Sequence, residues 1–199
     1  AGVAERRALG GTCLIWGCIP TKALLEQAHA LKIIKDAREW GVALPPGTPA
    51  IDMGQVQARK DRVVTGLTRG IEFLFKKNKV TWAKGAGRLL PGNIVEVTAA
   101  DGTNSQFAAR SVIVATGSAA ASLPFLPFDE ERVLSNVGAL AIPEVPKHLI
   151  VIGGGAIGLE LGSVWRRLGA KVTVIEFMPT ILPGSDEDVV KETDRVLRK

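Results

Sequence analysis

One stretch late in the 199-residue chain limits its possible folds more than any other. An apolar run over 149–152 leads into Gly-Gly-Gly-Ala-Ile-Gly at 153–158, a helical pattern continues to about residue 168, and a second apolar run covers 171–175. A strand, a G-x-G-x-x-G loop, a helix and a second strand in this order form the phosphate-binding unit of a dinucleotide fold. The sequence therefore predicts an α/β chain with a Rossmann-like domain.

The three spaced glycines of this loop have different roles. Gly153 allows a tight turn, Gly155 lets the backbone approach a pyrophosphate, and Gly158 permits close contact between helix and strand. The N–H groups of the first helical turn lack partners and can bind phosphate. We therefore expect NAD to be bound by Gly153, Gly155, Ala156, Ile157 and Gly158.

An acidic residue, Glu176, follows the second apolar run. A carboxylate at this position accepts hydrogen bonds from the two hydroxyls of the adenosine ribose and repels a 2′-phosphate. Glu176 therefore favours NAD over NADP. The alternative for this residue is a solvated acid at the end of a strand.

The only two cysteines, Cys13 and Cys18, are five residues apart. A disulfide needs Cα atoms within roughly 7 Å, and one continuous helix would carry residues at this spacing about 7.5 Å along its axis and onto different sides. We therefore expect Cys13 in a loop, a turn at Gly17, and Cys18 at the start of a helix whose first turn contains Pro20. A helix N-terminus there would stabilise the Cys18 thiolate.

Dithiol–disulfide exchange suits this pair better than the other roles open to two cysteines. A disulfide across so short a loop would stabilise the fold by only about 2 kcal/mol. No signal-peptide pattern precedes the pair, so an oxidising compartment is not indicated. A zinc site needs four ligands, and the only histidines, His29 and His148, are remote in the sequence. A metal-binding or incidental pair stays open as the weaker interpretation.

Residues 10–22 read Gly-Gly-Thr-Cys-Leu-Ile-Trp-Gly-Cys-Ile-Pro-Thr-Lys, and this segment resembles the active-site stretch of the flavin-dependent pyridine nucleotide–disulfide oxidoreductases. Ile15 stands where that family usually has asparagine. The segment Gly-Ser-Val-Trp-Arg-Arg-Leu-Gly-Ala at 162–170 is most similar to the branch of the family that oxidises dihydrolipoamide. The resemblance extends over essentially the whole chain.

The resemblance implies two Rossmann-like dinucleotide-binding domains, for FAD and NAD, both incomplete in this chain. The FAD domain, with the linker, would cover 1–146 and lack its first strand and glycine loop. The first half of the NAD domain would cover 147–199. The chain taken by itself is then expected to retain little FAD and to be inactive.

The resemblance also assigns roles to individual residues. Cys13 would be the sulfur that exchanges with substrate, and Cys18 the thiolate that lies against the flavin. Glu5 matches the acid that binds the FAD ribose, Lys22 the lysine beside the flavin ring, and Glu160 a residue near the nicotinamide; an ordinary position on a helix surface stays open for Lys22 and Glu160. The other matches to the FAD site are Gly87, Thr116, Gly117 and Ser118.

The implied activity is NAD-dependent oxidation of dihydrolipoamide to lipoamide by way of the disulfide and FAD. The enzyme would be the shared component of 2-oxoacid dehydrogenase complexes and would act on a lipoyl domain. It would be a homodimer in the bacterial cytoplasm or the mitochondrial matrix. The alternatives are a sister disulfide reductase acting on glutathione or mercuric ion, and a redox-sensing dinucleotide-binding protein without turnover. Glu176 argues against the sisters that use NADPH.

Charge and hydropathy exclude two other classes of partner. The net charge of +5 comes from Lys and Arg residues scattered among acids, and not from a basic stripe with aromatic residues. No apolar run of about 18 residues predicts a membrane span. We therefore expect neither nucleic acid nor a membrane as a partner.

The remaining patterns predict the elements between these motifs. Apolar residues at helical spacing predict helices over 20–40, ended by Gly41, and over 52–77, capped by Asp52. The apolar residues expected to face the core are Ala23, Leu24, Ala28, Leu31, Ile34 and Ala37 in the first helix, and Val56, Val63, Leu67, Ile71, Leu74 and Phe75 in the second. A continuous apolar run predicts a strand buried on both faces over 111–115, and a proline-containing passage between domains follows over 119–145. We also expect short antiparallel strands over 80–83, 94–98 and 106–108.

Overall fold

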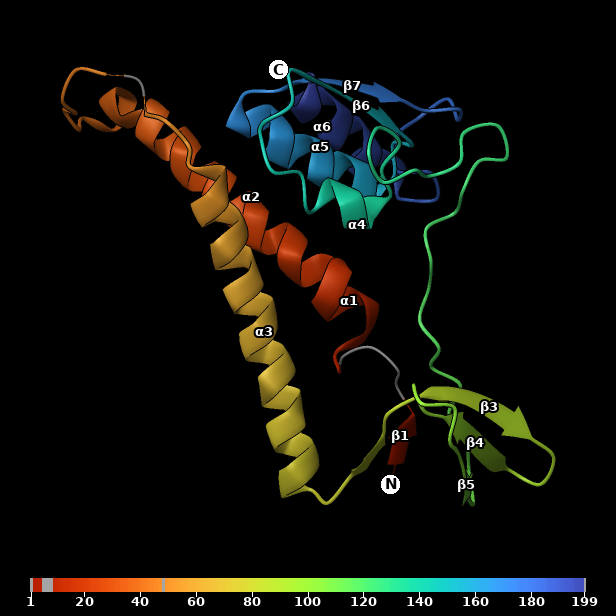
Figure 1. Cartoon of the computed structure of the whole chain (residues 1–199). Coiled ribbons are helices and arrows are strands. Elements are labelled where there is room, and N and C mark those ends of the chain that lie inside the picture. Colours follow the sequence, from red (N-terminus) through yellow and green to blue (C-terminus); the bar gives the residue numbers. More distant parts are fainter. Residues whose placement is uncertain (1, 5–8, 48, 199) are drawn as a thin grey trace. The chain divides into compact units, whose positions relative to one another are not determined.

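The computed structural model describes residues 2–4, 9–47 and 49–198. The chain forms two compact units, each made of two segments (Figure 1). The first contains Ala1–Ile19 and Arg62–Ala121, and the second contains Pro20–Asp61 and Ser122–Lys199. The domain boundary expected between residues 146 and 147 stays a prediction.

The strand–loop–helix–strand pattern of the second unit is confirmed. Strand β6 (His148–Ile152) pairs in parallel with β7 (Lys171–Ile175), from His148 opposite Lys171 to Ile152 opposite Ile175. Helix α5 (Ala156–Leu168) connects them, and α6 (Glu187–Leu197) follows. The core side chains of α5 are Leu161, Val164, Trp165 and Leu168, of which Val164 and Trp165 are fully buried.

Two long helices differ in how well their apolar patterns match burial. Helix α2 (Cys18–Lys35) buries Ala23, Leu24, Ala28 and Leu31 as expected. It ends earlier than predicted, because the chain tightens into the 3-10 helix η1 (Ala37–Trp40) before Gly41 takes a left-handed conformation. In α3 (Met53–Lys77), the expected cap is confirmed by a 3.0 Å hydrogen bond from the Gln55 N–H to Asp52. The prediction was wrong for three side chains on these helices that are 44–51% exposed: Ile34, Leu67 and Leu74.

The first unit contains two small sheets. Strand β1 (Gly2–Ala4) pairs in parallel with β2 (Thr81–Ala83), so the antiparallel pairing expected at 80–83 was wrong. Strands β3 (Ala86–Leu90), β4 (Ile94–Thr98) and β5 (Asn104–Ala108) form an antiparallel sheet in chain order. Strand β3 was not predicted, because Ala-Gly-Arg-Leu-Leu lacks β-branched residues and depends on its neighbour β4 for pairing.

The predicted buried strand at 111–115 is wrong. These residues form no strand, and Ile113 and Val114 are 89% and 73% exposed. A strand needs the N–H and C=O groups of a neighbour, and no described strand pairs with this run. The passage after it is mostly irregular, with one short helix, α4 (Asn136–Ala139), capped by the side chain of Ser135.

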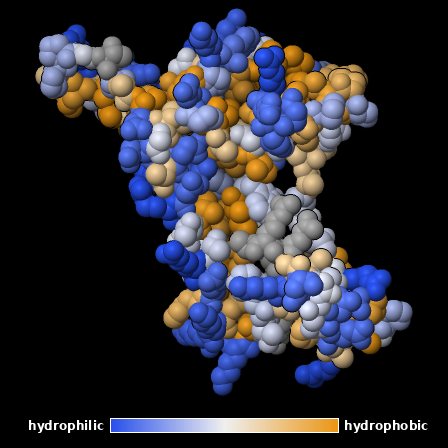
Figure 2. Space-filling view, in the orientation of Figure 1, coloured by the Kyte–Doolittle hydropathy of each residue, from blue (hydrophilic) through white to orange (hydrophobic). Residues whose placement is uncertain are grey.

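The surface is mixed in character. Apolar and hydrophilic side chains are interspersed on the face drawn in Figure 2. The large exposed apolar residues include Ile150, Ile152 and Phe177, around strands β6 and β7. Within the part of the chain that the structure describes, no helix is long and apolar enough to cross a membrane.

Candidate redox and dinucleotide sites

A break between two helices brings the cysteines together. Cys13 and Cys18 form a disulfide with Cα atoms 4.8 Å apart, inside the usual range of roughly 4.4–6.8 Å. The expectation of a loop at Cys13 was wrong, because this residue lies in the short helix α1 (Gly11–Trp16). Cys18 begins α2 as expected. The chain changes direction where α1 ends and α2 begins, and this change brings the two Cα atoms within disulfide range without a loop at Cys13.

Gly17 is the residue at this break, as predicted. A Cβ atom at this position would lie 2.8 Å from the Thr12 carbonyl oxygen and 3.0 Å from the Cα of Cys13. Both are backbone atoms and cannot rotate away. The disulfide loop therefore closes tightly only because residue 17 has no side chain. Cys13 and Cys18 are both exposed and accessible to another thiol.

Thr12, the residue before Cys13, contacts residues 117–118, and this contact was not predicted. Its hydroxyl oxygen accepts a long hydrogen bond of 3.5 Å from the Ser118 N–H. Gly117 has a φ of 79°, and a Cβ there would lie 3.2 Å from the same oxygen. The structure thus brings Gly117 and Ser118 next to the neighbour of Cys13. The position of Thr12 beside the first cysteine was the available signal.

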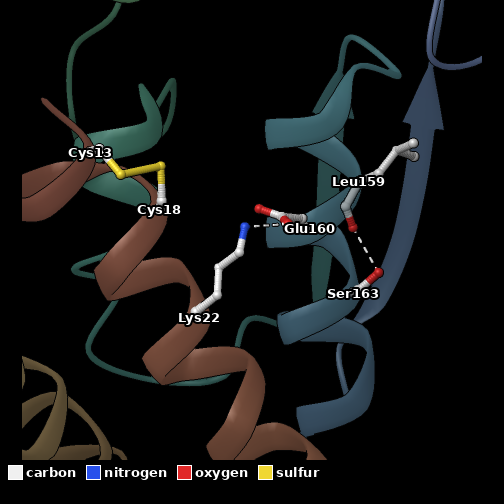
Figure 3. Close-up of polar contacts among 6 residues, drawn as sticks. All are labelled: Cys13, Cys18, Lys22, Leu159, Glu160 and Ser163. Carbon is white, nitrogen blue, oxygen red and sulfur yellow. Dashed lines mark hydrogen bonds and ion pairs between the residues drawn. A yellow bond between two sulfur atoms is a disulfide. The ribbon is translucent and has the colours of Figure 1, made fainter. Parts of the chain in front are cut away.

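Lys22 and Glu160 form an ion pair. The Lys22 ammonium lies 2.5 Å from Oε1 of Glu160, which connects α2 to α5 (Figure 3). Lys22 is four residues after Cys18 in the same helix and so lies on the same face. The two side chains are 56% and 36% exposed, so the pair stabilises the fold by at most about 1 kcal/mol. Its main consequence is that the two residues fix each other's position.

The glycine loop has the geometry expected of its first and last glycines. Gly153 has a φ of 105°, and its N–H donates to the Ile175 carbonyl at 2.8 Å. A Cβ at Gly158 would lie 2.3 Å from the Gly153 oxygen and 2.9 Å from Val151, so helix and strand approach too closely for a side chain. A Cβ at Gly155 would meet no atom within 4 Å. This side of the loop therefore has room for a ligand, next to the first turn of α5 where Ala156 and Ile157 are exposed.

Glu176 is held by backbone N–H groups. Its Oε1 accepts from Met178 at 2.8 Å and its Oε2 accepts from Gly154 at 2.6 Å. The N–H of Met178, and then that of Gly154, lowers the pKa of Glu176 below its ordinary value of 4.5. The carboxylate is therefore ionised at neutral pH and fixed at the edge of the glycine loop.

Comparison with known proteins identifies the family. A family profile described as pyridine nucleotide-disulphide oxidoreductase matches residues 3–199. The chain belongs to this family. It is 48% identical over 201 residues to dihydrolipoyl dehydrogenase 3 of Pseudomonas putida, covering 100% of this chain and 42% of that protein. It is 50% identical over 193 residues to dihydrolipoyl dehydrogenase of Trypanosoma brucei brucei, covering 95% of this chain and 40% of that protein.

A solved structure agrees with the assignment to the pyridine nucleotide-disulphide oxidoreductases. The fold is similar to the crystal structure of LpdA from Mycobacterium tuberculosis, with a TM-score of 0.89 and 26% identity. That similarity covers 100% of this chain and 43% of the other. The chain spans about 40% of the length of the curated relatives it matches. The mixed α/β fold expected from the sequence is confirmed.

The other residues selected by the family resemblance are less informative. Glu5 lies outside the described residues. Gly87 lies in β3 opposite Val97. A position with no room for a side chain is Gly85, directly before β3, where a Cβ would lie 2.4 Å from the Thr98 carbonyl oxygen.

Neither histidine lies in a candidate metal site. His29 is exposed on α2. His148 begins β6, and its Nε2 lies 2.9 Å from the Thr173 hydroxyl. Among residues 2–4, 9–47 and 49–198, no group of three or more His, Cys, Asp or Glu side chains is arranged to hold a metal ion.

Proposed function

We propose that the complete protein oxidises dihydrolipoamide to lipoamide and passes the electrons to NAD by way of FAD. The observation that carries this proposal is the exposed Cys13–Cys18 disulfide at the start of α2, with Lys22 one helical turn beyond it. Support for the substrate comes from the relatives, whose printed names are dihydrolipoyl dehydrogenase. Support for a dinucleotide comes from the open side of the glycine loop.

The two sulfurs would take different roles in the exchange. A thiolate of dihydrolipoamide attacks Sγ of Cys13, the S–S bond breaks, and Cys18 leaves as a thiolate. The second substrate thiol then attacks the mixed disulfide and releases Cys13 as a thiol. The substrate leaves as a disulfide and the protein keeps the two electrons as a dithiol. The position of Cys18 at the first residue of α2 supports its role, because free N–H groups there stabilise a thiolate.

The residues present fit two dinucleotides. For FAD, the left-handed Gly117 beside Thr12 leaves the backbone without a side chain, and Lys22 offers a fixed cation. For NAD, Gly155 and the first turn of α5 offer N–H groups, and Glu176 offers acceptors for ribose hydroxyls. Bound flavin would supply a two-electron carrier between the sulfurs and the nicotinamide. Lys22 and Glu160 would hold each other in place near the flavin and the nicotinamide.

The organisation of the complete protein follows from the same assignment. Residues 1–146 would belong to the FAD domain, and residues 147–199 to the first half of the NAD domain. The protein would be a homodimer that acts on a lipoyl domain of a 2-oxoacid dehydrogenase complex, in the bacterial cytoplasm or the mitochondrial matrix. The FAD ribose would be bound by Glu5, with Gly87, Thr116 and Ser118 around the rest of the cofactor.

Turnover of the complete protein tests the proposal. Lipoamide and NADH should form from dihydrolipoamide and NAD, and the Cys13→Ser and Cys18→Ser variants should lose this activity. Glutathione disulfide and mercuric ion, each supplied with NADPH, serve as alternative substrates and should give little turnover. Preference for either of these, or no turnover with dihydrolipoamide, would make the proposed function wrong.

A further inference from the structure

Gly154 is the unspecified second position of the G-x-G-x-x-G loop, yet both of its backbone polar groups are engaged. Its N–H donates to Oε2 of Glu176 at 2.6 Å, and its carbonyl accepts from the Leu182 N–H at 2.9 Å. A Cβ at this buried glycine would lie 3.0 Å from Cγ2 of Ile181 and 3.2 Å from Glu176. The chain that follows β7 therefore packs directly against the glycine loop.

The Glu176 carboxylate bridges these two loops. One oxygen binds Gly154 in the glycine loop, and the other binds Met178 in the segment after β7. A carboxylate has about four acceptor positions, so one position on each oxygen remains for another donor. Hydrogen bonds to an ionised acceptor are roughly twice as strong as neutral ones. The same group can therefore brace the loops and still accept two ribose hydroxyls.

We propose that Glu176 is a positioning residue that braces the glycine loop against residues 177–182 before the dinucleotide binds. The part of this proposal that concerns ligand affinity rests on the proposed NAD site, whereas the brace itself is a property of the free protein. The segment has support at its far end also, because the Ser185 N–H donates to the Leu182 carbonyl at 3.1 Å and Asp186 caps α6. Without the carboxylate, the N–H groups of Gly154 and Met178 both lose their partner, and the glycine loop keeps only its Leu182 hydrogen bond to the segment 177–182.

A glutamine at this position cannot replace the carboxylate. Glutamine has one acceptor oxygen, and its NH2 group would face one of the two N–H donors. The Glu176→Gln variant should therefore raise the amide exchange rate of Gly154 or Met178 about tenfold or more in the complete, NAD-free protein. Glu187→Gln is the matched control, because it removes one charge from an exposed acid on α6. This control should leave both amides at the wild-type rate.

A second pair of variants separates the positioning of the glycine loop by Glu176 from hydrogen bonding between Glu176 and the NAD ribose. Met178→Pro removes the N–H donor and keeps the carboxylate, whereas Met178→Ala keeps the donor. Met178→Pro should raise Gly154 exchange and weaken NAD binding about three- to tenfold, with the preference for NAD over NADP unchanged. Met178→Ala should match wild type.

Two results would overturn the brace. One is wild-type exchange at both amides in Glu176→Gln, and the other is the same behaviour in Met178→Pro and Met178→Ala. A wild-type protein that binds no NAD would refute the proposed function instead. The amide exchange rates of Gly154 and Met178 in the NAD-free protein would still show whether Glu176 holds the two loops together.

Discussion

Replacing Gly17 with alanine tests whether the break between α1 and α2 is what allows the disulfide to close. The new Cβ would lie 2.8 Å from the Thr12 carbonyl oxygen, roughly 0.6 Å closer than the shortest ordinary contact of 3.4 Å. The second contact, at 3.0 Å from the Cα of Cys13, prevents relief in that direction. Both neighbours are backbone atoms, so the two helices must move apart.

The expected cost is about 1–3 kcal/mol, the range for overpacking a tight site. This cost falls on the oxidised form, because reduction frees the two sulfurs and lets the helices separate. A disulfide strained by this amount should be reduced more easily, with a potential about 20–60 mV higher than wild type, since 30 mV corresponds to about 1.4 kcal/mol for two electrons.

The measurement is an equilibrium titration of the complete protein in thiol–disulfide buffers, with the free cysteines counted by alkylation. Gly66→Ala in α3 is the matched control, because a Cβ there would meet no atom within 4 Å. This control should leave the potential unchanged and stabilise the helix by about 0.5–1 kcal/mol. A Gly17→Ala protein with the wild-type potential would refute the reasoning, because it would show that the loop closes without the glycine.

Three further predictions concern the complete protein. Cys18→Ser should abolish the long-wavelength thiolate–flavin absorbance on reduction, whereas Cys13→Ser should preserve or enhance it; the reverse pattern in absorbance spectra would exchange the two roles. Glu176→Ala should lower NAD affinity roughly ten- to a hundredfold, with NADP affinity steady or improved, because hydrogen bonds to a charged acceptor are worth about 1.5–3 kcal/mol each; an unchanged NAD-to-NADP preference in binding titrations would show that Glu176 does not bind the ribose hydroxyls. The folded state lowers the pKa of Glu176 below 4.5, so its bonds to Met178 and Gly154 stabilise the protein fully at pH values above the unfolded-state pKa. This stabilisation is lost as the pH falls through the lower, folded-state pKa. Amide exchange at Gly154, corrected for the intrinsic effect of pH, should show this acid transition in wild type and not in Glu176→Gln.

The parts of the fold that could be predicted from the sequence are those whose cause is local. Strand β6, helix α5 and strand β7 form where the pattern placed them, because the apolar alternation and the glycine spacing lie within 30 residues of each other. The cap at Asp52 and the break at Gly17 are local for the same reason. Such features depend on the conformation of a few neighbouring residues.

The failures have the opposite cause. The run at 111–115 has the composition of a buried strand, but a strand forms only beside another strand, and none of those described pairs with it. Strand β3 has a poor composition and forms because β4 pairs with it along its whole length. In both cases, whether the residues form a strand depends on a neighbouring strand that can pair with them, and composition alone does not identify that neighbour.

The same distinction applies to the candidate sites. Lys22, Glu160 and Glu176 could be selected from the sequence as site residues, but each was predicted to contact a cofactor and not another part of the protein. In the structure, Lys22 and Glu160 form an ion pair with each other, and Glu176 accepts a hydrogen bond from Gly154 in the glycine loop. A fixed partner in the protein lowers the entropic cost of ordering a polar side chain when a ligand binds. In the proposed sites, these contacts between residues of the protein would therefore fix the side chains before a ligand binds.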